Sequence, residues 1–156
     1  LRGALTRAHQ YGFAPLCWFA LLGPAGAAGY WIAAQLAQRW WQDDWLGWIA
    51  QRGFRVVDWL PARLTALSFA AVGNFEDALY CWRTQGGTPA LPSALAVAAG
   101  AGAVGVRLNV DDAELGLGEQ PDADALQSAE ALLWRAAVLW LGALLLLGLV
   151  FWIAGR

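Results

Sequence analysis

Apolar and polar positions form long separate blocks along this chain of 156 residues. The clearest apolar block covers residues 136–154, which carry no charged side chain and lie between Arg135 and Arg156. A helix rises about 1.5 Å per residue, so this block is roughly 28 Å long, close to the hydrocarbon thickness of about 30 Å. It predicts a terminal transmembrane helix. An apolar stripe before it predicts one helix over 124–154, amphipathic at first and then spanning.

A second block without charge covers residues 10–38. It is long enough to cross a membrane, but Gly23, Pro24 and Gly26 interrupt it. Proline removes a backbone donor and glycine adds backbone freedom, so we expect a kinked membrane segment here. Because an exposed break would leave backbone groups unsatisfied in lipid, the break must pack on protein or line a cavity. A kinked helix and two half-helices meeting at a functional site both fit this pattern.

The middle of the chain predicts shorter elements. Residues 40–57 place Trp41, Trp45 and Trp48 at helical spacing with Arg52, which is typical of an amphipathic helix at the membrane interface. A connecting helix packed on the protein fits almost as well. The remaining predicted elements are a buried or half-membrane helix over 58–83, a small-residue segment over 93–106 and a polar loop over 107–122.

Composition agrees with a membrane protein. Apolar residues make up 59% of the chain and charged residues 14%, against about 45–50% and about 25% in typical globular domains. The eleven tryptophans suit an interface where one side of the ring is apolar and the other is wet. We therefore predict an all-α polytopic membrane protein. Because there is no methionine, we interpret residues 1–156 as a single membrane domain from the C-terminal portion of a longer protein.

Charge and cysteine content exclude several function classes. The net charge of −2 is too small to indicate nucleic-acid binding. All basic residues are arginine, so neither a Schiff-base lysine nor a P-loop lysine lies in this chain. Cys17 and Cys81 are far apart without metal-ligand spacing, and His9 alone cannot form a multi-histidine metal site.

Ionisable and polar groups near membrane depth are the candidate site residues. Arg63 offers a planar fork suited to a carboxylate or phosphate, and Glu76 with Asp77 offers ligands to hydrated Mg²⁺. The competing interpretation is that Asp58 and Asp77 are helix-end groups and that Arg63 pairs with one of them. Thr65 and Ser68 are expected to bond backbone carbonyls one turn back. The full candidate set is Arg63, Arg107 and Asp77 as catalytic residues, Asp58, Thr65, Asn74, Gly102 and Gly105 as substrate-binding residues, and Glu76 with Asp77 as weak metal ligands.

Three motifs resemble the CobD/CbiB family of bacterial membrane proteins of cobalamin biosynthesis. They are the Gly/Pro-rich stretch from Gly23 to Tyr30, the sequence Pro-Ala-Arg-Leu-Thr-Ala at 61–66, and the sequence Ala-Gly-Ala-Gly-Ala-Val-Gly-Val-Arg-Leu at 99–108. They occur in the family's order and are followed by a final hydrophobic span. The resemblance covers most of the chain.

This resemblance implies a polytopic protein of the bacterial inner membrane. It implies ATP-dependent amide-bond formation joining aminopropanol (or its phosphate) to adenosylcobyric acid, with Mg²⁺ as cofactor, a corrinoid as substrate and membrane lipid as surroundings. Arg63 and Arg107 are then the phosphate or carboxylate clamps, and Thr65 offers a hydroxyl contact.

The chain also departs from the family pattern. The upstream Gly-Arg-Asp-Thr stretch is absent, Asn109-Val110 replaces the usual Gly-Gly, and the Asn-Ala-Gly-type segment before the small-residue run is not recognisable. The stretch from Asp58 to Arg63 is also similar to the AmpE branch of membrane regulators. A non-enzymatic AmpE-like regulator is therefore the alternative, and a transporter with a broken helix at Gly23–Gly26 is a weaker third.

Overall fold

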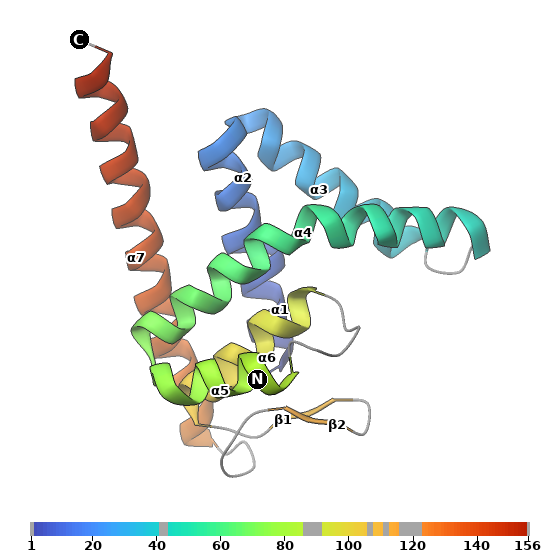
Figure 1. Cartoon of the computed structure of the whole chain (residues 1–156), viewed down its shortest axis with the longest axis vertical. Helices are drawn as coiled ribbons and strands as arrows, with labels where there is room; N and C mark the ends of the chain where they lie inside the picture. The colour runs from blue at the N-terminus through green and yellow to red at the C-terminus, as the bar shows by residue number, and fades with distance from the viewer. Residues whose placement is uncertain are drawn as a thin grey trace.

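The computed structural model describes residues 2–40, 44–85, 92–105, 108–110, 113–115 and 123–155. Over these residues the chain is helical apart from one short hairpin (Figure 1). The predicted all-α class is therefore confirmed for the described residues apart from this hairpin. Only one of these helices is long and apolar enough to span a membrane, so the predicted polytopic arrangement stays a prediction.

The N-terminal helices turn back on themselves. Helix α1 (Arg2–Ala8) continues through a π-helical segment, η1 (His9–Phe13), into α2 (Ala14–Leu22), and α3 (Pro24–Arg39) follows directly. Gly23 joins α2 to α3 with φ 69°, a conformation that glycine adopts without strain. Pro24 then starts α3 at a position where its missing N–H costs nothing. Where we predicted one kinked segment over 10–38, the structure has two helices forming a hairpin (Figure 1).

Helix α4 (Asp44–Val72) is longer than either element predicted there. It combines most of the expected 40–57 and 58–83 segments, because Pro61 lies inside the helix without ending it. The helix ends at Val72, and α5 (Phe75–Gln85) begins after Asn74, whose backbone N–H donates to the carbonyl of Ala103 at 3.1 Å. The break therefore lies at Gly73–Asn74 and not at Val57–Asp58.

Helix α6 (Pro92–Val104) packs closely against α4 and α5. Its small residues permit this approach, as the 93–106 pattern predicted. A β-carbon on Gly102 would lie 2.7 Å from the carbonyl oxygen of Asp77 and 2.9 Å from Sγ of Cys81. Gly102 thus sets the distance between α5 and α6.

Replacing Gly102 with alanine should lower the free energy of unfolding by about 1–3 kcal/mol, because the added methyl group meets α5 backbone. Denaturant titration of the purified protein in detergent measures this. Gly53→Ala is the matched control, since its β-carbon would meet nothing within 4 Å in α4. It should be neutral or stabilising by up to about 1 kcal/mol through helix propensity. An equal loss in both variants would contradict the packing role of Gly102.

Strands β1 (Leu108–Val110) and β2 (Ala113–Leu115) form an antiparallel pair in which Leu108 lies opposite Leu115. We predicted only a polar loop over 107–122, so this hairpin was missed. Three-residue strands give too short an alternation to be recognised in sequence.

The last helix, α7 (Ala123–Ala154), extends past the other helices to the C-terminus (Figure 1). Its segment Leu126–Ala154 is long and apolar enough to cross a membrane, and only 11% of its most apolar window is buried inside the structure. A core helix of a soluble protein would be mostly covered. The exposed apolar surface is what a hydrocarbon solvent favours.

Two apolar clusters hold the helices together. The larger brings Phe13, Phe69 and Trp140 together, with Phe13 and Phe69 edge to face at 5.7 Å between ring centroids. The Trp140 ring is buried, and its Nε1 donates to Oγ of Ser68 at 2.9 Å. The smaller cluster contains Ala14, Tyr30, Ala37 and Phe54. Next to this smaller cluster, polar side chains of η1, α3 and α4 contact one another around Asp58.

Candidate functional site

A buried polar network joins η1, α3 and α4. Nε2 of His9 lies 3.0 Å from Oδ1 of Asp58, and Nδ1 of His9 lies 3.0 Å from Oγ1 of Thr65. The hydroxyl of Tyr30 donates to the same Asp58 oxygen at 2.8 Å. His9, Asp58 and Thr65 are each 0% exposed, and Tyr30 is 1% exposed. Polar groups buried this completely must satisfy one another.

Local helix geometry explains how these side chains meet. Asp58 and Thr65 are seven residues apart in α4 and therefore lie on one face, two turns from each other. His9 is the first residue of the π-helical segment, a local widening of the helix that occurs frequently at functional sites. Tyr30 lies near the middle of α3 and reaches the network from the hairpin.

Pro61 leads to a second hydrogen bond between helices, next to Asp58. A proline has no N–H, so the carbonyl of Val57, four residues earlier, loses its helical donor. The indole Nε1 of Trp18 donates to that carbonyl at 3.2 Å. Helix α2 is thereby attached to α4 one residue before Asp58.

The hydrogen-bond partners of His9 indicate which ring nitrogen carries the proton in the neutral form. A carboxylate only accepts, so the bond to Asp58 Oδ1 requires a proton on His9 Nε2. In the neutral imidazole, Nδ1 then accepts from the hydroxyl of Thr65. Hydroxyl, imidazole and carboxylate thus lie in the order that activates a hydroxyl in hydrolase triads. Because all three groups are covered, this arrangement holds η1 against α4 and does not present a nucleophile to a substrate.

One atom of the network stands out. Oδ2 of Asp58 is buried and has no hydrogen-bond partner among the described residues. A hollow of about 440 Å³ lies close by, lined by Trp18, Gly26, Gly29, Tyr30 and Val57 among others. Tyr30 connects this hollow to the network through its bond to Asp58.

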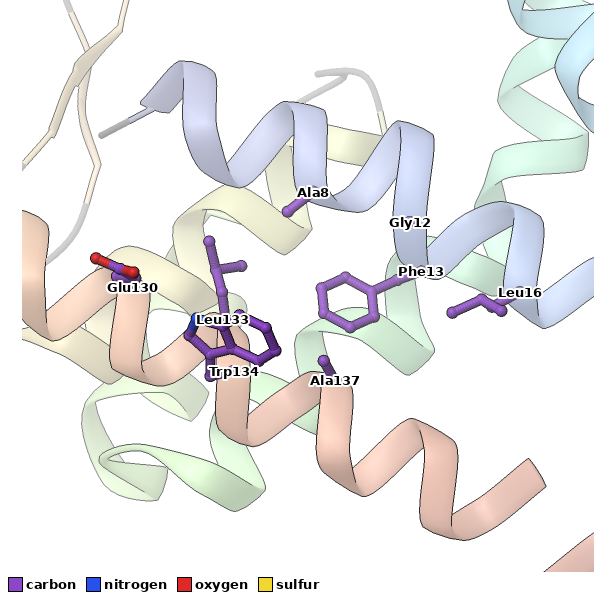
Figure 2. Close-up of a pocket in the computed structure, with 8 residues that line it drawn as sticks. All are labelled: Ala8, Gly12, Phe13, Leu16, Glu130, Leu133, Trp134 and Ala137. Carbon is purple, nitrogen blue, oxygen red and sulfur yellow. The ribbon is translucent and has the colours of Figure 1, made fainter. Parts of the chain in front are cut away.

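A separate groove of about 340 Å³ lies between the N-terminal helices and α7 (Figure 2). Ala8, Phe13 and Leu16 line one side, while Leu133 and Ala137 line the other. Its lining is almost wholly apolar, with Glu130 at one end (Figure 2). Such a surface offers few groups that could orient a polar substrate.

The structure brings only some of the predicted site residues together. Asp58 and Thr65 share the network through His9. Thr65 bonds His9 rather than a carbonyl one turn back, whereas Ser68 does bond the carbonyl of Leu64, at 2.7 Å.

Asn74, Glu76, Asp77 and Gly102 gather at the start of α5. The amide of Asn74 donates to Oδ2 of Asp77 at 2.6 Å, Glu76 is exposed, and Gly102 packs on the backbone of Asp77. No group of three His, Cys, Asp or Glu side chains that could hold a metal ion occurs in the described part of the chain. Glu76 and Asp77 therefore offer Mg²⁺ two carboxylates at most, with one already bonded to Asn74.

The remaining predicted residues lie elsewhere. The guanidinium of Arg63 is partly exposed and stacks on the ring of Trp59, with Cζ 4.0 Å from the ring centroid. Gly105 ends α6 with φ 74°. Arg107 lies outside the described residues.

Sequence reasoning missed His9 and Tyr30 as site residues. His9 was considered only as a metal ligand, and its partners are 49 and 56 residues away. A signal was available in α4, where the polar residues Asp58 and Thr65 share a face with the apolar Phe54 and Pro61. Polar groups on an apolar helix face need partners from other elements.

Comparison with known proteins gives a consistent result. A family model described as CobD/Cbib protein matches residues 11–137. Over 113 residues the chain is 40% identical to a Cobalamin biosynthesis protein CobD of Chromobacterium violaceum, covering 69% of this chain and 36% of that protein. Over 136 residues it is 36% identical to the protein of the same name from Stutzerimonas stutzeri, covering 78% and 45%.

The chain thus spans less than half the length of either curated relative. No solved structure matches it.

Proposed function

Because the chain belongs to the CobD/CbiB family, we propose that it acts in cobalamin biosynthesis as a CobD-type membrane protein. The observation that carries this proposal is the family match over residues 11–137, supported by two curated relatives at 36–40% identity. The exposed apolar helix α7 supports a membrane location. A multi-pass arrangement in the bacterial inner membrane is part of the proposal.

We propose ATP-dependent formation of an amide between the amine of aminopropanol, or of its phosphate, and the carboxylate of adenosylcobyric acid. ATP would activate the carboxylate, so that one carboxylate oxygen leaves with the phosphate-containing group taken from ATP while the amine loses a proton. Adenosylcobyric acid, ATP and the phosphate form of aminopropanol all present anionic oxygen atoms to the protein. Arg63 suits this chemistry because its planar guanidinium carries several N–H donors and is held by stacking on Trp59. One of those donors contacts the carbonyl of Trp59 at 3.4 Å. Arg107 is proposed as a second clamp.

ATP and Mg²⁺ enter this proposal through the family alone. When bound, Mg²⁺ would neutralise phosphate charge beside Glu76 and Asp77. The protein's own contribution is to hold the anionic groups with arginine and to fix α4 through the Asp58 network. In this role Asp58 and Thr65 act as positioning residues through His9, because their side chains are covered.

Complementation tests the proposal. The full protein should restore corrinoid-dependent growth to a bacterial mutant that lacks the amide-forming step, when only adenosylcobyric acid precursors are supplied. Arg63→Ala should reduce rescue by at least about tenfold, since a charge-assisted contact contributes about 1.5–3 kcal/mol. Arg83→Ala, an exposed arginine in α5, is the matched control and should rescue normally. Immunoblots of the membrane fraction confirm equal amounts of each variant.

Rescue that survives Arg63→Ala would remove this residue from the proposed site. Complete failure of the wild-type protein, at normal membrane levels, would favour the alternative of an AmpE-like regulator. Two observations support that alternative. The side chains of the Asp58 network are buried, and the predicted site residues fall into separate groups, so they do not form one site that could bind a substrate.

A further inference from the structure

The outward face of α4 carries an exposed stripe of tryptophan and arginine. Counting at about 100° per residue, its members fall within an arc of about 120° along the first four turns. The aromatic and aliphatic members are well exposed, with Trp45 at 70%, Val56 at 72% and Trp59 at 52%. We call this surface the Trp–Arg stripe; it consists of Trp45, Trp48, Ile49, Arg52, Arg55, Val56 and Trp59.

The fold does not require these side chains for its core. The opposite face of α4 is the buried one, and it carries Phe54, Asp58, Pro61 and Thr65. That face already fixes α4 through the polar network and the smaller apolar cluster. Five large apolar or aromatic side chains along one exposed helix face would be unfavourable in water. They therefore indicate a contact surface.

The charge of the stripe has one sign. Between residues 45 and 59 the only acidic residue is Asp58, which is 0% exposed on the far side of the helix. Arg52 and Arg55 are both exposed within the stripe. The guanidinium of Arg52 lies over the ring of Trp48, with Cζ 5.2 Å from the centroid. Cationic groups set among aromatic rings complement anionic phosphates above an apolar layer.

The direction of α4 fits an in-plane position. The N-terminal part of α4 runs across the direction of α7, the helix long enough to cross the membrane (Figure 1). If α7 crosses the bilayer along the membrane normal, this part of α4 lies parallel to the membrane plane. We propose that the Trp–Arg stripe lies in the membrane interface, with Arg52 and Arg55 binding the phosphates of anionic phospholipids.

Site-directed labelling of the full protein in lipid nanodiscs tests the position of the stripe. A nitroxide spin label attached at Val56→Cys should collide with both oxygen and a water-soluble nickel chelate. The ratio of the two accessibilities should place this label at a depth between those of two reference labels. Leu146→Cys on α7 provides the lipid reference, and Glu76→Cys on α5 provides the water reference; both positions are exposed. The unmodified protein controls for labelling of the buried Cys17 and Cys81.

A Val56 label as accessible to nickel as the Glu76 label would overturn the proposal. So would a label that neither probe reaches, because another protein segment would then cover the stripe. These outcomes are independent of cobalamin synthesis, so they do not depend on the proposed function.

The lipid charge is tested with a fluorescent bimane at Val56→Cys. Quenching by spin-labelled phosphatidylglycerol should exceed quenching by spin-labelled phosphatidylcholine by about two- to fivefold, since each arginine near an anionic surface favours such lipids. The double variant Arg52→Gln, Arg55→Gln should bring this ratio close to one, while Arg2→Gln at the exposed start of α1 should leave it unchanged. Equal quenching by the two lipids in the protein with Arg52 and Arg55 intact would overturn the proposed preference for anionic phospholipids.

Discussion

Replacing Asp58 with alanine is expected to lower the free energy of unfolding by about 2–6 kcal/mol, because two buried donors lose their acceptor at about 1–3 kcal/mol each. Asp58 Oδ1 is the shared acceptor for His9 Nε2 at 3.0 Å and for the Tyr30 hydroxyl at 2.8 Å. Without the carboxylate, two buried donors lose their partner in a region with no access to water. Unfolding midpoints of the purified protein, titrated with denaturing detergent and followed by tryptophan fluorescence, measure the loss.

Asp58→Asn separates the hydrogen bonds from the charge. Its side-chain oxygen can still accept from His9 and Tyr30, so we expect a smaller loss than for alanine. Glu76→Ala, at an exposed position of α5, should change the midpoint by less than about 0.5 kcal/mol. If Asp58→Ala were no worse than Glu76→Ala, the network would not stabilise the fold.

A charge in the middle of α7 should have the second large effect. Leu145→Arg is expected to cost about 3 kcal/mol for insertion of residues 123–155 into a membrane, because arginine at the helix centre meets hydrocarbon. Leu145 is 70% exposed, so the described part of the protein leaves most of its side chain uncovered. A glycosylation-mapping assay with this helix in a host protein gives the ratio of inserted to non-inserted helix, which should fall by roughly a hundredfold, since every 1.4 kcal/mol is tenfold.

Leu126→Arg is the control for this experiment. Leu126 is similarly exposed, at 54%, but it lies near the start of α7, outside the uncharged 136–154 block. Arginine there can reach the headgroup region, so the inserted fraction should change little. Equal insertion of both variants would contradict a transmembrane role for α7.

Sequence reasoning worked best where one helix carries its own signal. The uncharged 136–154 block places the end of α7 at 154, and the amphipathic stripe before it, predicted to begin at 124, places its start within a residue of Ala123. The small residues of 93–106 likewise mark α6, because close packing depends on their size at each position.

It worked less well where structure depends on distant partners. Asp58 and Thr65 could be selected as polar residues in an apolar helix, but their partners could not. His9 reaches them through a π-helical segment, and one sequence gives no pattern for such a segment. Likewise we predicted separate elements over 40–57 and 58–83, whereas α4 continues through Pro61, and the indole of Trp18 bonds the carbonyl that the proline leaves free.

The π-helical segment also affects how related sequences can be aligned. A π turn contains about one residue more than an α turn, so η1 rotates α1 relative to α2 by roughly a quarter turn. A homologue with a regular α-helix here would need one residue fewer between His9 and Phe13 to keep both helices in phase. A single-residue gap at this point would therefore mark which homologues have lost the wide turn.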